Sequence, residues 1–174
     1  MKWVLRIFGL LLFAFVLVFA VGVLVPKEHE ASVRAVVAAE EDVVWEKVSQ
    51  MESWPTWHAD IEGMERMPDR EGKPYWLMQS SWGDMPQIVD EVSPAQRLVT
   101  IIPEDADLGY SGSWTWELEE SDEGTVLTIT ERGLVTNPLM RFVSRFVMGY
   151  HGSLRTFQEQ LGGDIGQPVR LEDL

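Results

Sequence analysis

The stretch that decides the fold of this chain is NPLMRFVSRFVMGYHGSLRTFQEQL, residues 137–161. Asn137 followed by Pro138 is typical of a helix start, because asparagine caps the first turn and proline suits the first helical position. Apolar side chains then recur at intervals of three or four residues, which places them on one helix face: Leu139, Phe142, Phe146, Tyr150, Leu154, Phe157 and Leu161. The pattern predicts one continuous helix that stops at Gly162-Gly163, with a tail over residues 163–174.

Upstream of this helix, short apolar segments show the two-residue period of β-strands. The first such segment covers residues 31–37, where small apolar residues alternate with polar ones. Further strand candidates are separated by turn sequences rich in Gly, Pro, Asp and Ser: residues 61–67, 75–82, 87–92, 98–102, 113–118 and 126–132. Such short connections predict an antiparallel sheet of about seven strands and not βαβ crossovers.

Two short helices are expected between the first and second strands. The acidic run Glu40-Glu41-Asp42 favours a helix start, and apolar residues follow it at helical spacing from Val44 to Val48. Pro55 restricts the residues before it, so the segment Trp54-Pro55-Thr56-Trp57 predicts a separate helical turn.

The N-terminal segment is apolar over residues 7–25, about the length that spans a ~30 Å hydrocarbon core as a helix. Lys2 and Arg6 precede it, which predicts a cytoplasmic N-terminus and a domain on the extracytoplasmic side, periplasmic or extracellular. The alternative is a cleaved signal peptide with a small-x-small site at Ala20-Val21-Gly22, but the apolar run continues beyond that site. We therefore expect residues 1–27 to form a cytoplasmic stub and an uncleaved single-pass membrane anchor.

Composition excludes several classes of function. A net charge of −14, from 28 acidic and 14 basic residues, disfavours binding to nucleic acid phosphates. The chain has no cysteine and therefore no disulfide or thiolate ligand. It lacks the motifs of zinc proteases, P-loops, dinucleotide-binding folds and serine hydrolases, and the acidic run at residues 104–107 lacks EF-hand spacing. We expect no metal, no cofactor and no nucleic-acid partner.

The order of these elements resembles the START-like helix-grip fold, in which a curved antiparallel sheet surrounds a long C-terminal helix. Three segments resemble polyketide cyclase/dehydrase and lipid-transport proteins of the SRPBCC superfamily: Val44-Trp45 followed by residues 54–57, the strand TVLTITERG at residues 125–133, and the helix start at residues 137–142. The resemblance implies an α+β domain over residues 28–162 with a cavity between sheet and helix. Members of this group bind lipids, hormones or polyketides and only some are catalytic, so the fold alone does not fix the function.

The expected lining of that cavity is aromatic and apolar. Trp114 and Trp116 alternate onto one face of their strand, while two registers compete within residues 75–82, of which one turns Tyr75 inward. Gly149 inside a helix costs about 1 kcal/mol relative to alanine, which indicates either a close ligand or a kink. The expected cavity residues are Trp54, Trp57, Trp76, Met78, Trp82, Trp114, Trp116, Phe142, Phe146, Met148, Gly149 and Tyr150.

Polar groups suited to acid or base chemistry are few. The candidates are His58, His151, Glu131 and Tyr110, and no spacing forces any two of them together. His58 and His151 meet only if both approach the cavity mouth. Glu131 shares a strand face with apolar residues, so it needs a partner if that face is buried.

These observations favour a membrane-anchored domain that binds or transfers an apolar small molecule such as a lipid, an isoprenoid or a polyketide-like compound, without requiring catalysis. Two alternatives stay open. One is a cyclase or dehydratase that acts on a polyketide-like or aromatic substrate, and the other is an envelope protein-interaction domain whose cavity is filled by its tryptophans. The sequence names neither the ligand nor a protein partner.

Overall fold

The computed structural model describes residues 2–81, 83–106 and 108–174. Within these residues, eight strands form one antiparallel sheet in the order β2-β3-β4-β5-β6-β7-β1-β8. The strands are β1 (Glu28–Val37), β2 (Ile61–Arg70), β3 (Lys73–Ser80), β4 (Met85–Ser93), β5 (Arg97–Ile102), β6 (Tyr110–Ser121), β7 (Gly124–Val135) and β8 (Val169–Asp173). A short 3₁₀ turn, η2 (Glu104–Ala106), lies between β5 and β6.

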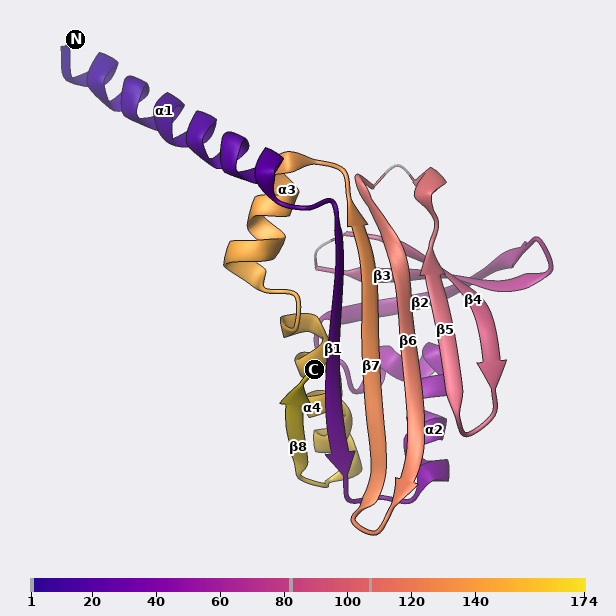
Figure 1. Cartoon of the computed structure of the whole chain (residues 1–174). Coiled ribbons are helices and arrows are strands. Elements are labelled where there is room, and N and C mark those ends of the chain that lie inside the picture. Colours follow the sequence, from indigo (N-terminus) through magenta and orange to yellow (C-terminus); the bar gives the residue numbers. More distant parts are fainter. Residues whose placement is uncertain (1, 82, 107) are drawn as a thin grey trace.

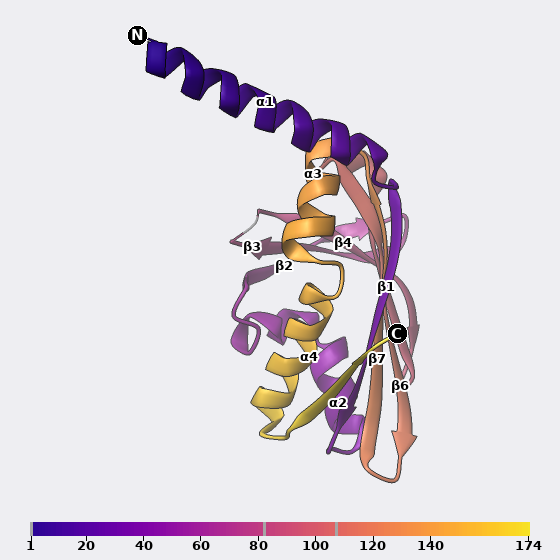
Figure 2. The ribbon, with the colours of Figure 1, turned by 60° about the vertical axis from the view of Figure 1, so that its left-hand side comes forward.

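The predicted α+β helix-grip architecture is confirmed. Two short helices, α2 (Glu41–Ser49) and the 3₁₀ helix η1 (Met51–Thr56), follow β1 as expected. Together with α4 (Gly152–Ile165) they lie on one side of the curved sheet, whose long strands β1, β6 and β7 form the opposite wall (Figures 1 and 2). Each strand expected from the sequence is present, and β8 is the additional one.

The core lies between α4 and the inner face of β1, β6 and β7. Its fully buried side chains include Val33, Val37, Leu127, Ile129, Trp116, Leu154, Phe157 and Leu161, and burial of such a side chain stabilises the fold by about 1.5–3 kcal/mol. Gln158 crosses this core, because its Nε2 atom donates to the carbonyl oxygens of Val33 (3.0 Å) and Leu127 (2.9 Å). The amide therefore fixes α4 against two strands at once.

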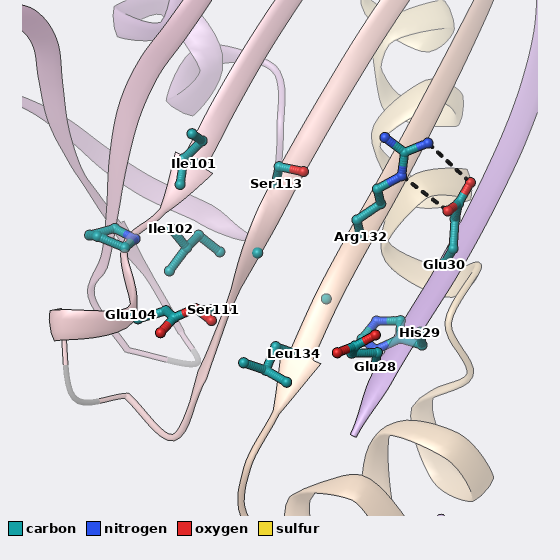
Figure 3. Close-up of a pocket in the computed structure, with 13 residues that line it drawn as sticks. Glu28, His29, Glu30, Ile101, Ile102, Glu104, Ser111, Ser113, Arg132 and Leu134 are labelled. Atoms are coloured by element: carbon teal, nitrogen blue, oxygen red, sulfur yellow. Dashed lines mark hydrogen bonds and ion pairs between the residues drawn. The ribbon is translucent and has the colours of Figure 1, made fainter. Parts of the chain in front are cut away.

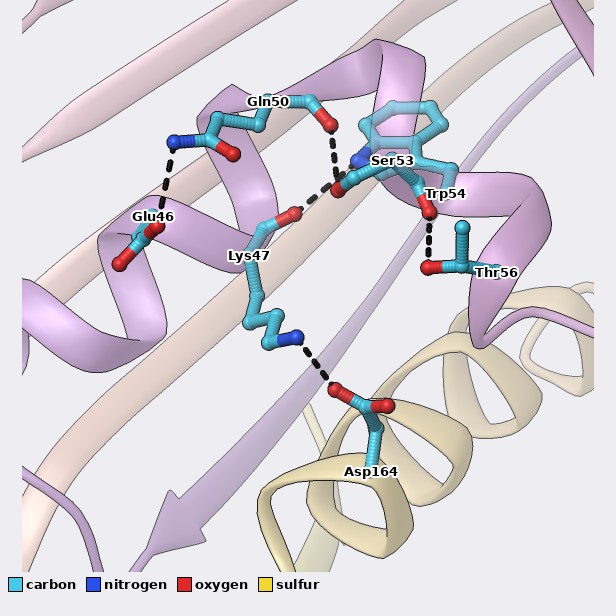
Figure 4. Close-up of polar contacts among 7 residues, drawn as sticks. All are labelled: Glu46, Lys47, Gln50, Ser53, Trp54, Thr56 and Asp164. Atoms are coloured by element: carbon cyan, nitrogen blue, oxygen red, sulfur yellow. Dashed lines mark hydrogen bonds and ion pairs between the residues drawn. The ribbon is translucent and has the colours of Figure 1, made fainter.

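Hydrogen bonds from the Trp54 side chain fix the helical turn around Pro55. The indole Nε1 atom of Trp54 donates to the carbonyl oxygen of Lys47 in the preceding helix at 3.1 Å (Figure 4). It also donates to the carbonyl oxygen of Val48 at 3.2 Å. Lys47 in turn forms a 2.6 Å ion pair with Asp164 near the end of α4. The two short helices are thus joined to each other and to the helix that the sheet grips.

The prediction of one continuous C-terminal helix is wrong. The segment divides into α3 (Pro138–Val143), the π-helix η3 (Ser144–Met148) and α4. The break lies at Gly149, whose φ of 73° is a left-handed conformation that glycine adopts readily. The predicted cap is confirmed, since the Asn137 side chain accepts a hydrogen bond from the backbone N–H of Leu139 at 2.9 Å.

The predicted tail over residues 163–174 is also wrong. Helix α4 continues to Ile165 and ends at Gly166, and β8 then pairs with β1. Gly162 does not stop the helix. It is buried, and a Cβ atom there would clash with the side chain of Val169 at the start of β8.

The first helix, α1 (Lys2–Leu24), projects away from the sheet with its apolar side chains exposed (Figures 1 and 2). Within the described residues it is the one helix long and apolar enough to cross a membrane, a property that a signal sequence shares. Its C-terminal end packs against α3, where a Cβ atom on Gly22 would clash with the carbonyl of Pro138.

Candidate ligand-binding cavity

Two adjoining chambers lie between the inner face of the sheet and the C-terminal helical elements. The larger has a volume of about 460 Å³ and the smaller about 280 Å³. They share six lining residues, Met85, Tyr110, Trp114, Met148, Gly149 and Ser153. Together they form a hollow of the size that small-molecule sites usually have.

The larger chamber has mostly apolar walls. Strand β6 contributes Trp114 and Trp116, β3 contributes Met78, and α4 contributes Phe157. The ring of Phe157 is edge-on to that of Trp54, with centroids 5.3 Å apart, a favoured aromatic geometry. Of the two registers considered for β3, the structure has the one that turns Met78 inward.

Polar groups interrupt these walls, among them the buried His58 and Gln87 and the half-buried Tyr110. His58 is 8% exposed, and its Nδ1 atom has no hydrogen-bond partner among the described residues. Burial lowers the pKa of His58, which favours the neutral imidazole. Burial raises the pKa of Tyr110, so its phenol stays protonated near neutral pH and has an O–H group to offer a ligand.

The smaller chamber ends at a histidine–glutamate pair. His29 on β1 and Glu131 on β7 approach to 3.1 Å between Nε2 and Oε1. The imidazole stacks on the ring of Tyr150, with centroids 4.1 Å apart and planes 10° from parallel. The other Glu131 oxygen accepts a 3.5 Å contact from the hydroxyl of Ser153. The pair places a carboxylate and an imidazole at one end of a hollow whose larger chamber has mostly apolar walls.

A glycine makes room for this pair. Gly133 on β7 is the register partner of His29, and a Cβ atom at Gly133 would clash with the imidazole ring. His29 was not among the expected site residues, because the alternating pattern was read from residue 31 whereas β1 begins at Glu28. Its position two residues before Ala31 puts it on the inward face of β1, and this alternation was the available signal.

The structure brings together many of the residues expected at the cavity. Trp54, Met78, Trp114, Trp116, Met148 and Gly149 line the larger chamber, as do His58 and Tyr110, while Tyr150 and Glu131 line the smaller one. Within the described ranges, no three His, Asp or Glu side chains are grouped to hold a metal ion.

Five expected residues line neither chamber: Trp57, Trp76, Phe142, Phe146 and His151. Phe142 and Phe146 contact each other instead, at 5.1 Å between ring centroids, because the break at Gly149 removes this part of the helix from the core. Trp57 packs edge-on against Phe157, and Trp76 stacks beneath the guanidinium of Arg66. Trp82 lies outside the described residues.

A third hollow, of about 620 Å³, lies on the outer face of the sheet and is open to solvent. Figure 3 shows Arg132 and Glu30 paired on the neighbouring strands β7 and β1 at one side of it, with Nε and Oε2 3.0 Å apart. Gly112 and Gly133 line this outer depression and also the smaller chamber. The backbone of these two glycines is therefore part of the wall between the two hollows. Because the outer hollow is open to solvent and its Arg132 already pairs with Glu30, we place the candidate site on the inner face.

Comparisons with known proteins agree with this geometry. A family described as "Polyketide cyclase / dehydrase and lipid transport" matches residues 28–162. A search of the curated proteins found no match.

Solved structures of similar fold come from bacteria and plants. The Zhui aromatase/cyclase of a Streptomyces species has a TM-score of 0.61 and 17% identity, covering 80% of this chain and 93% of that one. A START superfamily protein of Mycobacterium smegmatis has a TM-score of 0.60 and 16% identity, covering 81% and 98%. The major latex-like protein 151 of Panax ginseng has a TM-score of 0.64 and 11% identity, covering 80% and 98%. At these identities the likeness shows a shared fold.

Proposed function

The chain belongs to the polyketide cyclase/dehydrase and lipid transport family, and from that premise we propose that it is a membrane-anchored domain that binds or transfers a mainly apolar small molecule. The observation that carries the proposal is the hollow between sheet and α4, which has apolar walls in its larger chamber and the His29–Glu131 pair at the end of the smaller one. The interaction-domain alternative required a filled cavity, and this hollow does not fit it.

The lining supports a ligand with an apolar body and one hydrogen-bonding group. Tryptophan faces and the flexible side chains of Met78 and Met85 suit an apolar body of variable shape. Glu131 offers carboxylate oxygens to a hydroxyl or other donor, whereas a ligand carboxylate would meet a like charge there. We therefore favour a hydroxyl-bearing lipid, isoprenoid or polyketide over a free fatty acid.

The anchor is the second part of the proposal. Residues 1–27 hold the chain in the membrane through α1, the binding domain runs from β1 to β8, and Lys2 and Arg6 keep the N-terminus in the cytoplasm. The domain then lies on the extracytoplasmic side, close to the bilayer in which apolar molecules partition.

The test is native mass spectrometry of the full chain purified from membranes, combined with organic extraction. The wild type should carry a co-purified molecule of lipid size. Met85→Trp, which places an indole where both chambers meet, should reduce the bound fraction severalfold. Val92→Trp, at an exposed site on the same strand, should not. A wild-type chain that is empty and takes up no apolar fluorescent probe would contradict the proposal.

One observation favours a second function. His29, Glu131 and Tyr110 line the same small chamber, and a cyclase or dehydratase needs such convergent groups: a base to remove a proton and a donor for the oxygen that leaves. Here His29 is the base, Glu131 orients it, and the Tyr110 phenol is the donor.

The test of this second function is incubation of the full chain with a linear poly-β-ketone thioester, followed by mass spectrometry for loss of one water. His29→Asn should abolish the product, whereas His151→Asn, outside the chambers, should not. Equal product formation by the wild type and His29→Asn would rule out this mechanism.

A further inference from the structure

We propose that the lid segment, residues 140–148 of α3 and η3, lies in the interfacial layer of the membrane that holds α1, so that ligands pass between the lipid leaflet and the smaller chamber. The inference rests on the membrane anchoring in the proposed function. It concerns a surface outside the chambers and the route by which they are reached.

The first step of the argument is the fixed junction between the anchor and the lid segment. Arg141 is only 7% exposed, and its Nη1 atom donates to the carbonyl oxygens of Val25 (2.8 Å) and Val23 (3.4 Å). Carbonyls at a helix C-terminus lack intrahelical partners, and a cation there complements the helix dipole. Arg141 therefore caps α1, while the backbone of Gly22 packs directly against Pro138 at the start of α3.

The second step is the direction of the lid segment. Because α3 starts at the end of the apolar helix, it starts where the hydrocarbon core of the membrane ends. In both views α3 and η3 run across the direction of α1 and do not continue it (Figures 1 and 2). A helix fixed in this way to the end of a membrane span lies along the membrane surface.

The third step is the chemistry of the exposed face. Large apolar side chains of the segment are open to solvent: Met140 (40% exposed), Phe146 (58%), Val147 (71%) and Met148 (53%). Residues 137–148 contain no acidic side chain, although the whole chain has a net charge of −14. Arg145 is exposed beside the apolar group and suits anionic headgroups. A group of large exposed apolar side chains on one short segment is typical of a membrane or protein contact, and the packing of this segment against the end of α1 favours the membrane.

The fourth step connects this surface to the cavity. Met140, Ser144 and Met148 also line the smaller chamber, so one short segment is both a chamber wall and the exposed apolar face. Gly149, with its left-handed φ of 73°, follows the segment directly and separates it from α4. Displacement of the lid segment about this glycine would open the chamber toward lipid.

The chain has no cysteine, so a single introduced thiol reports on one site. The full-length Val147→Cys variant, labelled with the polarity-sensitive dye NBD, is reconstituted into phosphatidylcholine vesicles that contain some phosphatidylglycerol. Val92→Cys is the matched control, because Val92 is an equally apolar side chain, 52% exposed, on β4. Quenching by doxyl-labelled lipids should be severalfold stronger at position 147 than at position 92. Equal, weak quenching at both sites, as expected if a protein covers the face, would overturn the proposal.

A second variant tests the junction. Arg141→Met, combined with Val147→Cys, removes the donors to Val23 and Val25 but retains an apolar side chain. Quenching at position 147 should then fall toward the value at position 92, while the chain stays in the membrane fraction. Unchanged quenching would refute the role of Arg141. If mass spectrometry finds no ligand but quenching at position 147 is strong, only the proposed function is overturned. If a lipid is bound but position 147 is not quenched, only this inference is overturned.

Discussion

At the scale of single residues, His58 couples stability to pH. The His58 ring is buried, with its centroid 5.5 Å from that of the Phe157 ring. This burial lowers the pKa of His58. Above about pH 6.5 the histidine is neutral in the folded and unfolded chains alike, so it adds no pH dependence there. Below that pH the unfolded chain takes up a proton that the folded chain resists, and stability falls.

We therefore expect the free energy of unfolding to decrease between about pH 7.5 and about pH 5 in the wild type, and to decrease less in His58→Asn. Denaturant titrations at the two pH values measure this. His151→Asn is the control and should keep the wild-type slope, because His151 lies outside the chambers. Identical slopes for the wild type and His58→Asn would show that burial of His58 does not govern the acid response.

A second prediction at this scale concerns Glu131. Glu131→Gln keeps the shape of the side chain but removes its charge, and a hydrogen bond to a charged group contributes about 1.5–3 kcal/mol. Affinity for a fluorescent long-chain alcohol should fall about tenfold, and affinity for its methyl ether should not change. Glu30→Gln, at the outer face where Glu30 pairs with Arg132, is the control. Equal losses for the alcohol and the ether would indicate a structural role for Glu131.

At the scale of elements, neighbouring glycines in α4 have opposite roles. Gly162 is buried, and a Cβ atom there would clash with Val169 of β8, whereas a Cβ atom at Gly163 would meet nothing within 4 Å. Gly162→Ala should destabilise the chain by about 1–3 kcal/mol through overpacking. Gly163→Ala should stabilise it by up to about 1 kcal/mol through helix propensity. Denaturant unfolding of both variants measures the difference, and equal effects would show that β8 does not pack on the helix in solution.

At the scale of the whole molecule, the proposed topology separates the two termini across the membrane. Lys2→Cys and Glu172→Cys place single thiols at exposed positions near each end. A membrane-impermeant maleimide applied to intact cells with a permeable outer envelope should label position 172, and position 2 only after lysis. If position 2 is never labelled and the mature chain lacks its first residues by mass, α1 is a cleaved signal sequence. Labelling of position 2 in intact cells would reverse the orientation.

The architecture of the whole domain followed from local sequence patterns. Strand alternation, turn residues and the Asn137-Pro138 helix start depend on neighbours a few residues away, so they predicted the helix-grip order of elements. The apolar run over residues 7–25 likewise predicted one long membrane-spanning helix from composition alone, and the structure has a helix there, α1. Trp114 and Trp116 line the larger chamber from one face of β6, and alternation along a strand is the local pattern that puts two such residues on the same face.

Tertiary structure alone decided the features that depend on contacts distant in sequence. The His29–Glu131 pair joins residues 102 positions apart, and the inward register of Met78 follows from its partners in the sheet. The helical spacing in residues 139–161 was correctly identified, but periodicity does not reveal that the helix breaks at Gly149. Before the break α3 packs on α1, and after it α4 packs on the sheet. Local sequence determines the preferred backbone conformation of a segment and the face of the helix or strand on which each side chain lies. A cavity, in contrast, is the volume left between elements, and only their packing defines it.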